Sequence, residues 1–217
     1  RTHPKLQISG IPFSLKSLAS LWVSCRGFSI IDLVENSTTK TKYALKRMTC
    51  HGIEDQQIAL REIELSSSIN HRNIINIVDY MVEGNADIVI NATSEVYMVL
   101  PYYKNGSLQD NLNHRARSRD FMNETQALHI FLGVCEGLKA LHEAKPDPIA
   151  HRDLKTANIC LSDTMEPVLV DLGSATEARV QICGQQDAQK IARYCRGALL
   201  NCLSSSGTLQ CSELLHD

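Results

Sequence analysis

The chain has 217 residues, of which 43% are hydrophobic and 21% charged, and its formal net charge at pH 7 is −2. This composition is typical of a globular protein of one or two domains, and the balanced charge gives no sign of a nucleic-acid partner. No apolar run approaches the roughly 20 residues that a membrane-spanning helix requires. The eight cysteines form no C-x-x-C pair, which argues against a zinc site. Cys135 and Cys160 lie within apolar segments, as small core residues do, which favours a reducing, cytoplasmic location.

The first 26 residues contain neither a clear periodicity nor a motif. From Gly27 the pattern changes, and residues 28–35 and 41–48 predict two β-strands joined by a turn over 36–39. Apolar side chains then recur at helical spacing, which predicts a helix over residues 56–69.

Two further strands are predicted over residues 74–82 and 95–100, with a polar, loop-like insert over 83–94. Further along, Asn123 and Gln126 have the spacing of a capping box, which predicts a helix from residue 124 to about 142. This helix is apolar on more than one face, so we expect it to be buried from several sides.

The stretch from His151 to Asn158 reads H-R-D-L-K-T-A-N, and a short hairpin over residues 159–170 is predicted to follow it. The octet resembles the catalytic loop of a protein kinase, and the resemblance implies phosphoryl transfer. In that chemistry a carboxylate, here Asp153, would accept the proton of the attacking hydroxyl, and an amide, here Asn158, would hold a magnesium ion. An ammonium group, here Lys155, would neutralise charge on the transferring phosphoryl group. A polar turn between two strands is the alternative interpretation, but five fixed identities within eight residues rarely arise by chance.

With these segments in place, residues 27–195 resemble a serine/threonine protein kinase, and in particular the Numb-associated kinase family and its small myristoylated and palmitoylated member. The resemblance rests on Gly27-Phe28-Ser29, Asp32-Leu33-Val34-Glu35, Tyr43-Ala44-Leu45-Lys46-Arg47, Ala150-His151-Arg152-Asp153-Leu154-Lys155 and Pro167-Val168-Leu169-Val170-Asp171-Leu172-Gly173-Ser174. It implies an α+β fold: an N-lobe made of an antiparallel sheet with one helix, and a truncated, mostly helical C-lobe.

The resemblance implies a non-specific serine/threonine protein kinase that transfers the γ-phosphate of ATP to Ser or Thr hydroxyls of protein substrates, with Mg²⁺. Asp153 would act as the base, Lys46 would hold the α- and β-phosphates, and Glu62 would orient Lys46. Glu64 competes for this last role, but the H-x-N-I-like segment at 71–74 favours Glu62.

The remaining site residues also follow from the resemblance. Asn158 and Asp171 would bind the metal. The nucleotide would contact Gly27, Ile31, Lys46, Leu100, Tyr103, Asn158 and Asp171. Asp110 could reach the ribose, although an aspartate at the start of a helix is equally consistent with its position.

The resemblance also implies three segments of the chain. They are an atypical N-terminal segment (1–26), a partial kinase domain (27–195) and a C-terminal tail outside the family pattern (196–217). Within the kinase domain it gives an N-lobe (27–100), a hinge (101–107) and a partial C-lobe (108–195).

Three departures from the family pattern favour a second interpretation. Ser24, Cys25 and Arg26 precede Gly27, so only the end of a glycine-rich loop is present. No A-P-E motif follows Cys195, and we therefore expect helix 124–142 to expose a large apolar patch. The lipidation signal of the family is missing from residues 1–26, so association with the Golgi or other membranes is not supported. The alternative is a catalytically impaired, kinase-like binding or scaffold module, or a truncated gene product.

Overall fold

The computed structural model describes residues 5–8, 11–14, 20–23, 29–84 and 92–177. The chain divides into two compact units, Arg1–Lys104 and Asn105–Asp217, and each is described by itself below. The division falls within residues 101–107, the stretch predicted as the hinge.

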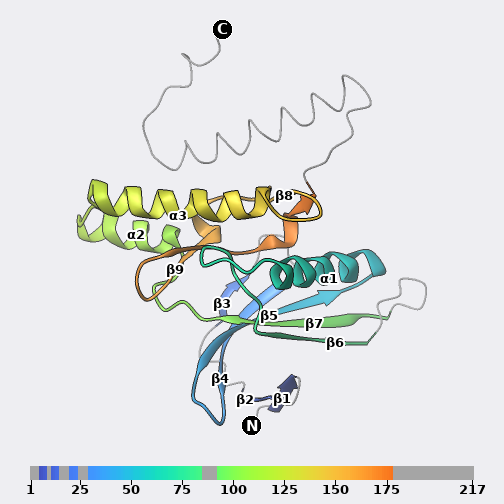
Figure 1. The fold of residues 1–217 in the computed structure, drawn as a ribbon. Coiled ribbons are helices and arrows are strands. Elements are labelled where there is room, and N and C mark those ends of the chain that lie inside the picture. The colour runs from blue at the N-terminus through green and yellow to red at the C-terminus, as the bar shows by residue number, and fades with distance from the viewer. Residues whose placement is uncertain (1–4, 9–10, 15–19, 24–28, 85–91, 178–217) are drawn as a thin grey trace. The chain divides into compact units, whose positions relative to one another are not determined.

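In its described residues, the first unit is an antiparallel sheet with one helix (Figure 1). Its elements are β1 (Lys5–Ile8), β2 (Ile11–Ser14), β3 (Ser20–Val23), β4 (Ser29–Asn36), β5 (Lys42–Cys50), α1 (Ile53–Ser68), β6 (Asp79–Glu83) and β7 (Ser94–Pro101). The strand order is β1-β2-β4-β5-β7-β6, and β3 pairs with β4. The strands predicted over 28–35, 41–48 and 95–100 and the helix over 56–69 are confirmed.

Two predictions for this unit were wrong. The strand expected over residues 74–82 begins only at Asp79. The first 26 residues, in which no pattern was found, contribute strands β1, β2 and β3.

The two faces of this sheet carry separate apolar clusters, because successive side chains of a strand point to opposite faces. The cluster on the α1 side consists of Cys50, Ala59, Ile63, Val96 and Met98. The cluster on the other face consists of Val34, Leu45 and Val99. Lys46 lies directly across from Met98 in the β5–β7 register, so its side chain belongs to the face that α1 covers.

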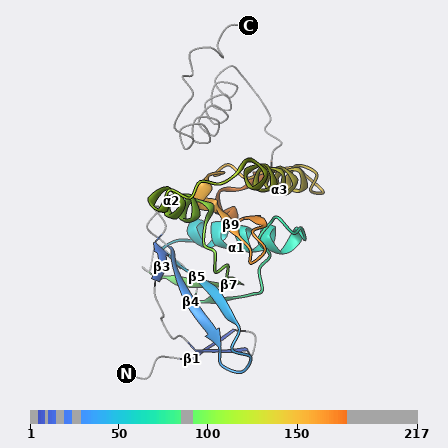
Figure 2. The ribbon, with the colours of Figure 1, turned by 90° about the vertical axis from the view of Figure 1, so that its left-hand side faces the viewer.

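In its described residues, 105–177, the second unit contains two α-helices and two small two-stranded sheets. Its elements are α2 (Leu108–Ser118), α3 (Glu124–His142), β8 (Ile149–Ala150), η1 (Thr156–Asn158), β9 (Ile159–Leu161), β10 (Pro167–Leu169), η2 (Leu172–Ser174) and β11 (Thr176–Glu177). In Figure 2 both long helices are seen nearly end-on, which shows that their axes run in similar directions. The predicted helix over 124–142 and the predicted hairpin are confirmed, whereas α2 was not predicted.

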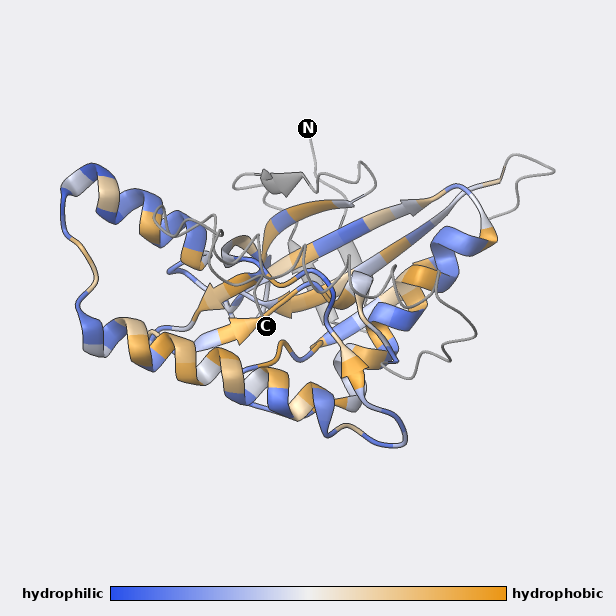
Figure 3. Ribbon diagram, turned by 90° about the horizontal axis from the view of Figure 1, so that it is seen from above, coloured by the Kyte–Doolittle hydropathy of each residue, from blue (hydrophilic) through white to orange (hydrophobic). Residues whose placement is uncertain are grey.

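One face of α3 is buried against β8 and β10. Its buried residues are Ile130, Gly133, Val134, Gly137 and Leu141. Apolar positions recur along the whole helix (Figure 3), and Leu128, Phe131 and Leu132 on another face are exposed. The expected apolar patch on this helix is therefore present, but the expectation that the helix is buried from several sides was wrong for the part of the chain that the structure describes.

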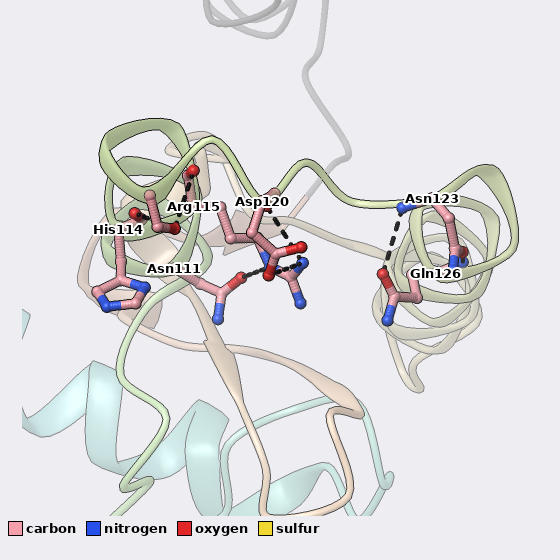
Figure 4. A network of polar contacts seen from close by, with 7 residues as sticks. Asn111, His114, Arg115, Asp120, Asn123 and Gln126 are labelled. Atoms are coloured by element: carbon pink, nitrogen blue, oxygen red, sulfur yellow. Dashed lines mark hydrogen bonds and ion pairs between the residues drawn. The ribbon is translucent and has the colours of Figure 1, made fainter.

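Both helices of this unit begin with a capping box. Asn123 Oδ1 accepts a hydrogen bond from the backbone N–H of Gln126 at 2.9 Å, and Gln126 Oε1 accepts one from the N–H of Asn123 at 3.2 Å (Figure 4). Ser107 and Asp110 make the same reciprocal pair at the start of α2. The capping box predicted at Asn123 is confirmed, and Asp110 stands at a helix start.

A small polar network fixes the end of α2 and the turn that follows it. Arg115 Nε donates to Asn111 Oδ1 at 2.9 Å, and Arg115 Nη1 lies 3.3 Å from Asp120 Oδ2 (Figure 4). These contacts, together with the capping boxes, set where each helix starts and stops. Of the helices described, none is both long enough and apolar enough to cross a membrane.

Candidate active site

The loop between β8 and η1 holds the carboxylate of Asp153 in place. Asp153 Oδ2 accepts hydrogen bonds from Lys155 Nζ at 2.9 Å and from Asn158 Nδ2 at 3.0 Å. Asn158 Nδ2 also donates to the backbone carbonyl of Asp153 at 2.9 Å. Within the described part of the chain, Oδ1 of Asp153 accepts no hydrogen bond, and the side chain is 28% exposed. Oδ1 is therefore the atom open to a hydroxyl donor.

His151 stabilises this loop through two hydrogen bonds. It is buried, with 3% of its surface exposed. Its Nε2 lies 3.2 Å from the carbonyl oxygen of Val170, and its Nδ1 accepts the N–H of Asp153 at 3.3 Å. Because a carbonyl can only accept, Nε2 carries the proton and Nδ1 is the acceptor. The imidazole thus bridges the loop and the end of β10.

Burial lowers the pKa of His151, while the Val170 carbonyl and the carboxylates of Asp171 and Asp153 act in the opposite direction. The lowered pKa keeps the ring neutral at pH 7. A neutral ring is what this geometry requires, because a proton on Nδ1 would remove the acceptor for the Asp153 N–H.

The hairpin brings Asp171 next to Asn158. The N–H of Val170 donates to the carbonyl of Asn158 at 3.0 Å, and Asp171 follows directly. Asp171 has φ 63° and ψ 72°, in the left-handed region that non-glycine residues rarely adopt. Arg152, beside the base, also has a positive φ of 64°. Backbone strain of this kind is concentrated at functional sites.

The donor set of Asn158 and Asp171 suits Mg²⁺. The amide nitrogen of Asn158 points toward Asp153, which leaves its amide oxygen as the ligand atom. Amide and carboxylate oxygens are the ligands that Mg²⁺ prefers, and Mg²⁺ usually takes only one or two protein ligands beside phosphate and water. Residues 29–84 and 92–177 contain no group of three or more His, Cys, Asp or Glu placed to hold a metal.

A second set of predicted site residues lies in the first unit. Lys46 Nζ lies 2.7 Å from Glu62 Oε1 and 2.8 Å from Oε2. Only 9% of the Lys46 side chain and 5% of the Glu62 side chain are exposed. A charge buried to this degree requires a partner. The competing residue, Glu64, is exposed, so the structure pairs Lys46 with Glu62.

The structure describes all but one of the remaining residues that were predicted to contact the nucleotide. Ile31 is the register partner of Lys46 across β4 and β5. Leu100 stands two residues after Met98 on β7, and therefore shares the Lys46 face of the sheet. Tyr103 follows that strand and is partly buried. Gly27 lies outside the described residues.

The structure thus brings the predicted residues together in two sets. Lys46 and Glu62 form one set in the first unit. The other set lies in the second unit and consists of Asp153, Lys155, Asn158 and Asp171, which lie close to one another. Each set is described within its own unit.

Two contributors to the loop were missed by the sequence analysis. His151 was quoted as part of the motif but was given no role, although a histidine two residues before a catalytic aspartate is a signal in itself. Thr156 Oγ1 donates to Gln109 Oε1 and so ties η1 to α2. Nothing local in the sequence indicates this long-range contact.

Comparison with known proteins agrees with this geometry. The protein kinase domain family matches residues 27–195. The chain is 40% identical over 162 residues to serine/threonine-protein kinase 16 of Rattus norvegicus and of Homo sapiens, covering 75% of this chain and 50% of each relative. It is 28% identical over 206 residues to serine/threonine-protein kinase ENV7 of Saccharomyces cerevisiae, covering 75% of this chain and 56% of that protein.

The chain therefore belongs to the protein kinase family. It spans about half the length of the relatives that it matches.

Proposed function

We propose that this chain is a serine/threonine protein kinase that transfers the γ-phosphate of ATP to hydroxyl groups of protein substrates. The observation that carries the proposal is the set of hydrogen bonds on Asp153. Lys155 and Asn158 hold one carboxylate oxygen and leave the other open to a hydroxyl. The matched family and the serine/threonine kinases among the relatives support the same reaction class.

In this reaction each residue of the site has its own role. Asp153 accepts the hydroxyl proton, and Lys155 lies 2.9 Å from it, where its positive charge offsets negative charge on the group being transferred. Bound Mg²⁺ supplies charge neutralisation at the phosphates, and Asn158 and Asp171 are the residues that would hold it. Lys46, fixed by Glu62, grips the phosphate chain. Positioning and electrostatics, rather than covalent chemistry, supply the rate.

The direct test replaces the base. We expect Asp153→Asn to lower the rate of phosphate transfer from radiolabelled ATP to a peptide library by about 10²- to 10⁴-fold, because the amide cannot accept the proton. Asp163→Asn, a carboxylate-to-amide change in the β9–β10 turn, serves as the matched control and should keep the parent rate. Equal rates in the parent and Asp153→Asn would refute the assignment of the base.

The second candidate is a kinase-like binding or scaffold module. It is favoured by the sequence before Gly27, where Ser24 and Arg26 replace residues of a glycine-rich loop. Side chains at these two positions would hinder the close approach of backbone N–H groups to phosphate. A parent chain that binds ATP but shows no transfer above the Asp153→Asn background would support the module and exclude the enzyme.

We also propose two finer assignments. The motifs around Lys46 and Asp171 support membership of the Numb-associated kinases, and protein substrates with Ser or Thr acceptors follow from the reaction class. A cytoplasmic location is supported by Cys50, Cys135 and Cys160, which are free thiols. Fractionation of cells that express a tagged chain tests the location, and recovery in the membrane pellet would contradict it.

A further inference from the structure

The start of α2 and the chain just before it run along the segment that carries η1 and β9. The N–H of Leu161 donates to the carbonyl of Gly106 at 3.0 Å, and Ser107 forms an antiparallel bridge with Cys160. Helix α2 itself packs against both η1 and β9. These backbone contacts hold β9 in place, and the residues of η1 that precede it therefore lie next to the first turn of α2.

One side chain of α2 reaches η1 directly. The hydroxyl of Thr156 donates to Oε1 of Gln109, and both residues are partly buried. Nε2 of Gln109 donates in turn to Oδ1 of Asn113, one turn further along α2, at 3.2 Å. Because the nitrogen of the Gln109 amide is used within the helix, its oxygen is directed at Thr156 and acts as a fixed acceptor.

Thr156 stands at the end of η1 that needs an anchor. The turn runs from Thr156 to Asn158, and its last residue continues directly into β9. Its first residue follows the loop, and among the described residues no side chain caps this end of the turn. A 3₁₀ turn of three residues has little stability of its own, so the start of η1 depends on the contact with Gln109.

The position of η1 determines where the amide of Asn158 points. The N–H of Asn158 donates to the carbonyl of Lys155 at 2.9 Å and closes the turn. Its side-chain nitrogen donates to the backbone carbonyl of Asp153 at 2.9 Å and to Oδ2 of Asp153 at 3.0 Å. A displaced η1 would therefore move the donor that orients the base, and with it the amide oxygen assigned to Mg²⁺.

We propose that Gln109 and Thr156 are positioning residues of the active site. Gln109 holds the hydroxyl of Thr156, and this contact fixes η1. The fixed turn keeps the Asn158 amide against Asp153, so both residues act through Asn158. This role rests on the proposed function, because it concerns the same site. A misplacement of about 1 Å can lower a rate by about 100-fold even when it arises away from the chemistry.

Two pairs of variants test the contact. Thr156→Val and Gln109→Leu remove the hydrogen bond and nearly preserve side-chain size, whereas Thr156→Ser and Gln109→Glu keep the donor and the acceptor. We expect kcat for peptide phosphorylation to fall about tenfold in each variant of the first pair, with the KM for the peptide changed by less than about twofold. Each variant of the second pair should stay within about twofold of the parent in both constants.

Further variants show whether the two residues act as one contact. The double variant Gln109→Leu with Thr156→Val should lose no more than either single variant, since both single changes break the same hydrogen bond. Gln57→Leu, at an exposed position of α1, and Thr125→Val, in the exposed first turn of α3, make the same changes elsewhere. Both should keep the parent rate.

A second measurement needs no catalysis. Amide hydrogen exchange of the nucleotide-free chain, followed by mass spectrometry, reports how firmly residues 153–158 are held. Exchange in this stretch should be about tenfold faster in Thr156→Val and Gln109→Leu, and should match the parent in Thr156→Ser and Gln109→Glu. Exchange over α3 is the internal reference, because a general loss of stability would accelerate it as well.

The two measurements separate this role from the proposed function. A parent chain that transfers no phosphate contradicts the proposed function, and the exchange rates then still decide whether Gln109 holds the loop. Three results would overturn the positioning role. The first is exchange over residues 153–158 that matches the parent in Thr156→Val and Gln109→Leu, or that rises no more than exchange over α3. The second is an active parent whose kcat survives loss of the contact, including a change confined to KM. The third is effects of the two single variants that add in the double variant.

Discussion

Oδ1 of Asp153 is available to accept a proton because Lys155 and Asn158 both donate their hydrogen bonds to Oδ2. All three residues lie within six positions, so the motif alone was sufficient to identify them, although the hydrogen bonds among them were not predicted. The neutral His151 beneath the loop is less evident from the sequence. One of its two hydrogen bonds joins residues 19 positions apart, and burial by residues distant in the chain sets its pKa.

His151 makes stability depend on pH in a defined direction. Its pKa in the folded chain lies below the ordinary value of 6.5, so the unfolded chain binds more protons between those two values. The free energy of unfolding should therefore fall as the pH drops below 6.5, by at most about 1.4 kcal/mol per pH unit. Urea titrations between pH 7.5 and the acid limit of solubility measure this slope.

The controls replace histidine by an amide that does not titrate. His151→Asn should lose this contribution to the slope, whereas His142→Asn, on the exposed end of α3, should retain it. An identical pH dependence in the parent and His151→Asn would show that this ring does not control the effect.

Burial also determines thiol reactivity. Burial raises the pKa of Cys160 to about 11, and the carboxylate of Asp110 adds to the shift. At pH 8 only about one Cys160 in a thousand is then a thiolate. We expect iodoacetamide to label the exposed Cys135 well before Cys160 or the buried Cys50, as measured by mass spectrometry of timed digests. Equal labelling rates in the native protein, rather than only after denaturation, would contradict this order.

At the scale of elements, local signals predicted some features and missed others. The α3 capping box and its long apolar pattern were readable because both are local. Helix α2 was missed because its sequence is polar nearly all round and Leu108 is its only buried residue, so no helical period appears. Strands β1, β2 and β3 have four residues each, and pairing with distant partners rather than local pattern defines such short strands.

The start of α3 offers a test of local stabilisation. Asn123→Ala removes the acceptor for the Gln126 N–H and should lower the free energy of unfolding by about 1 kcal/mol. Thr125→Ala, in the same exposed turn, keeps the cap and should change stability little. Chemical denaturation of both variants measures the difference, and equal destabilisation would show that the capping box contributes nothing specific.

At the scale of the whole molecule, the proposed site draws on both units. Lys46 and Glu62 come from the first unit, and Asp153, Asn158 and Asp171 come from the second. The family resemblance selected Glu62 over Glu64, and the structure pairs Glu62 with Lys46. No periodicity or spacing in the sequence relates these two sets to one another. Their action on one nucleotide is the central claim of the proposed function.

Thermal unfolding with and without Mg²⁺ and ATP tests this claim most directly. Saturating nucleotide should raise the stability of the parent by about 2–3 kcal/mol, or about 5–10 °C in Tm. Lys46→Met in the first unit and Asp171→Ala in the second should each lose most of that shift, while Lys40→Met, at an exposed lysine in the turn between β4 and β5, should keep it. No shift in the parent, or a full shift in either site variant, would contradict a nucleotide site built from both units.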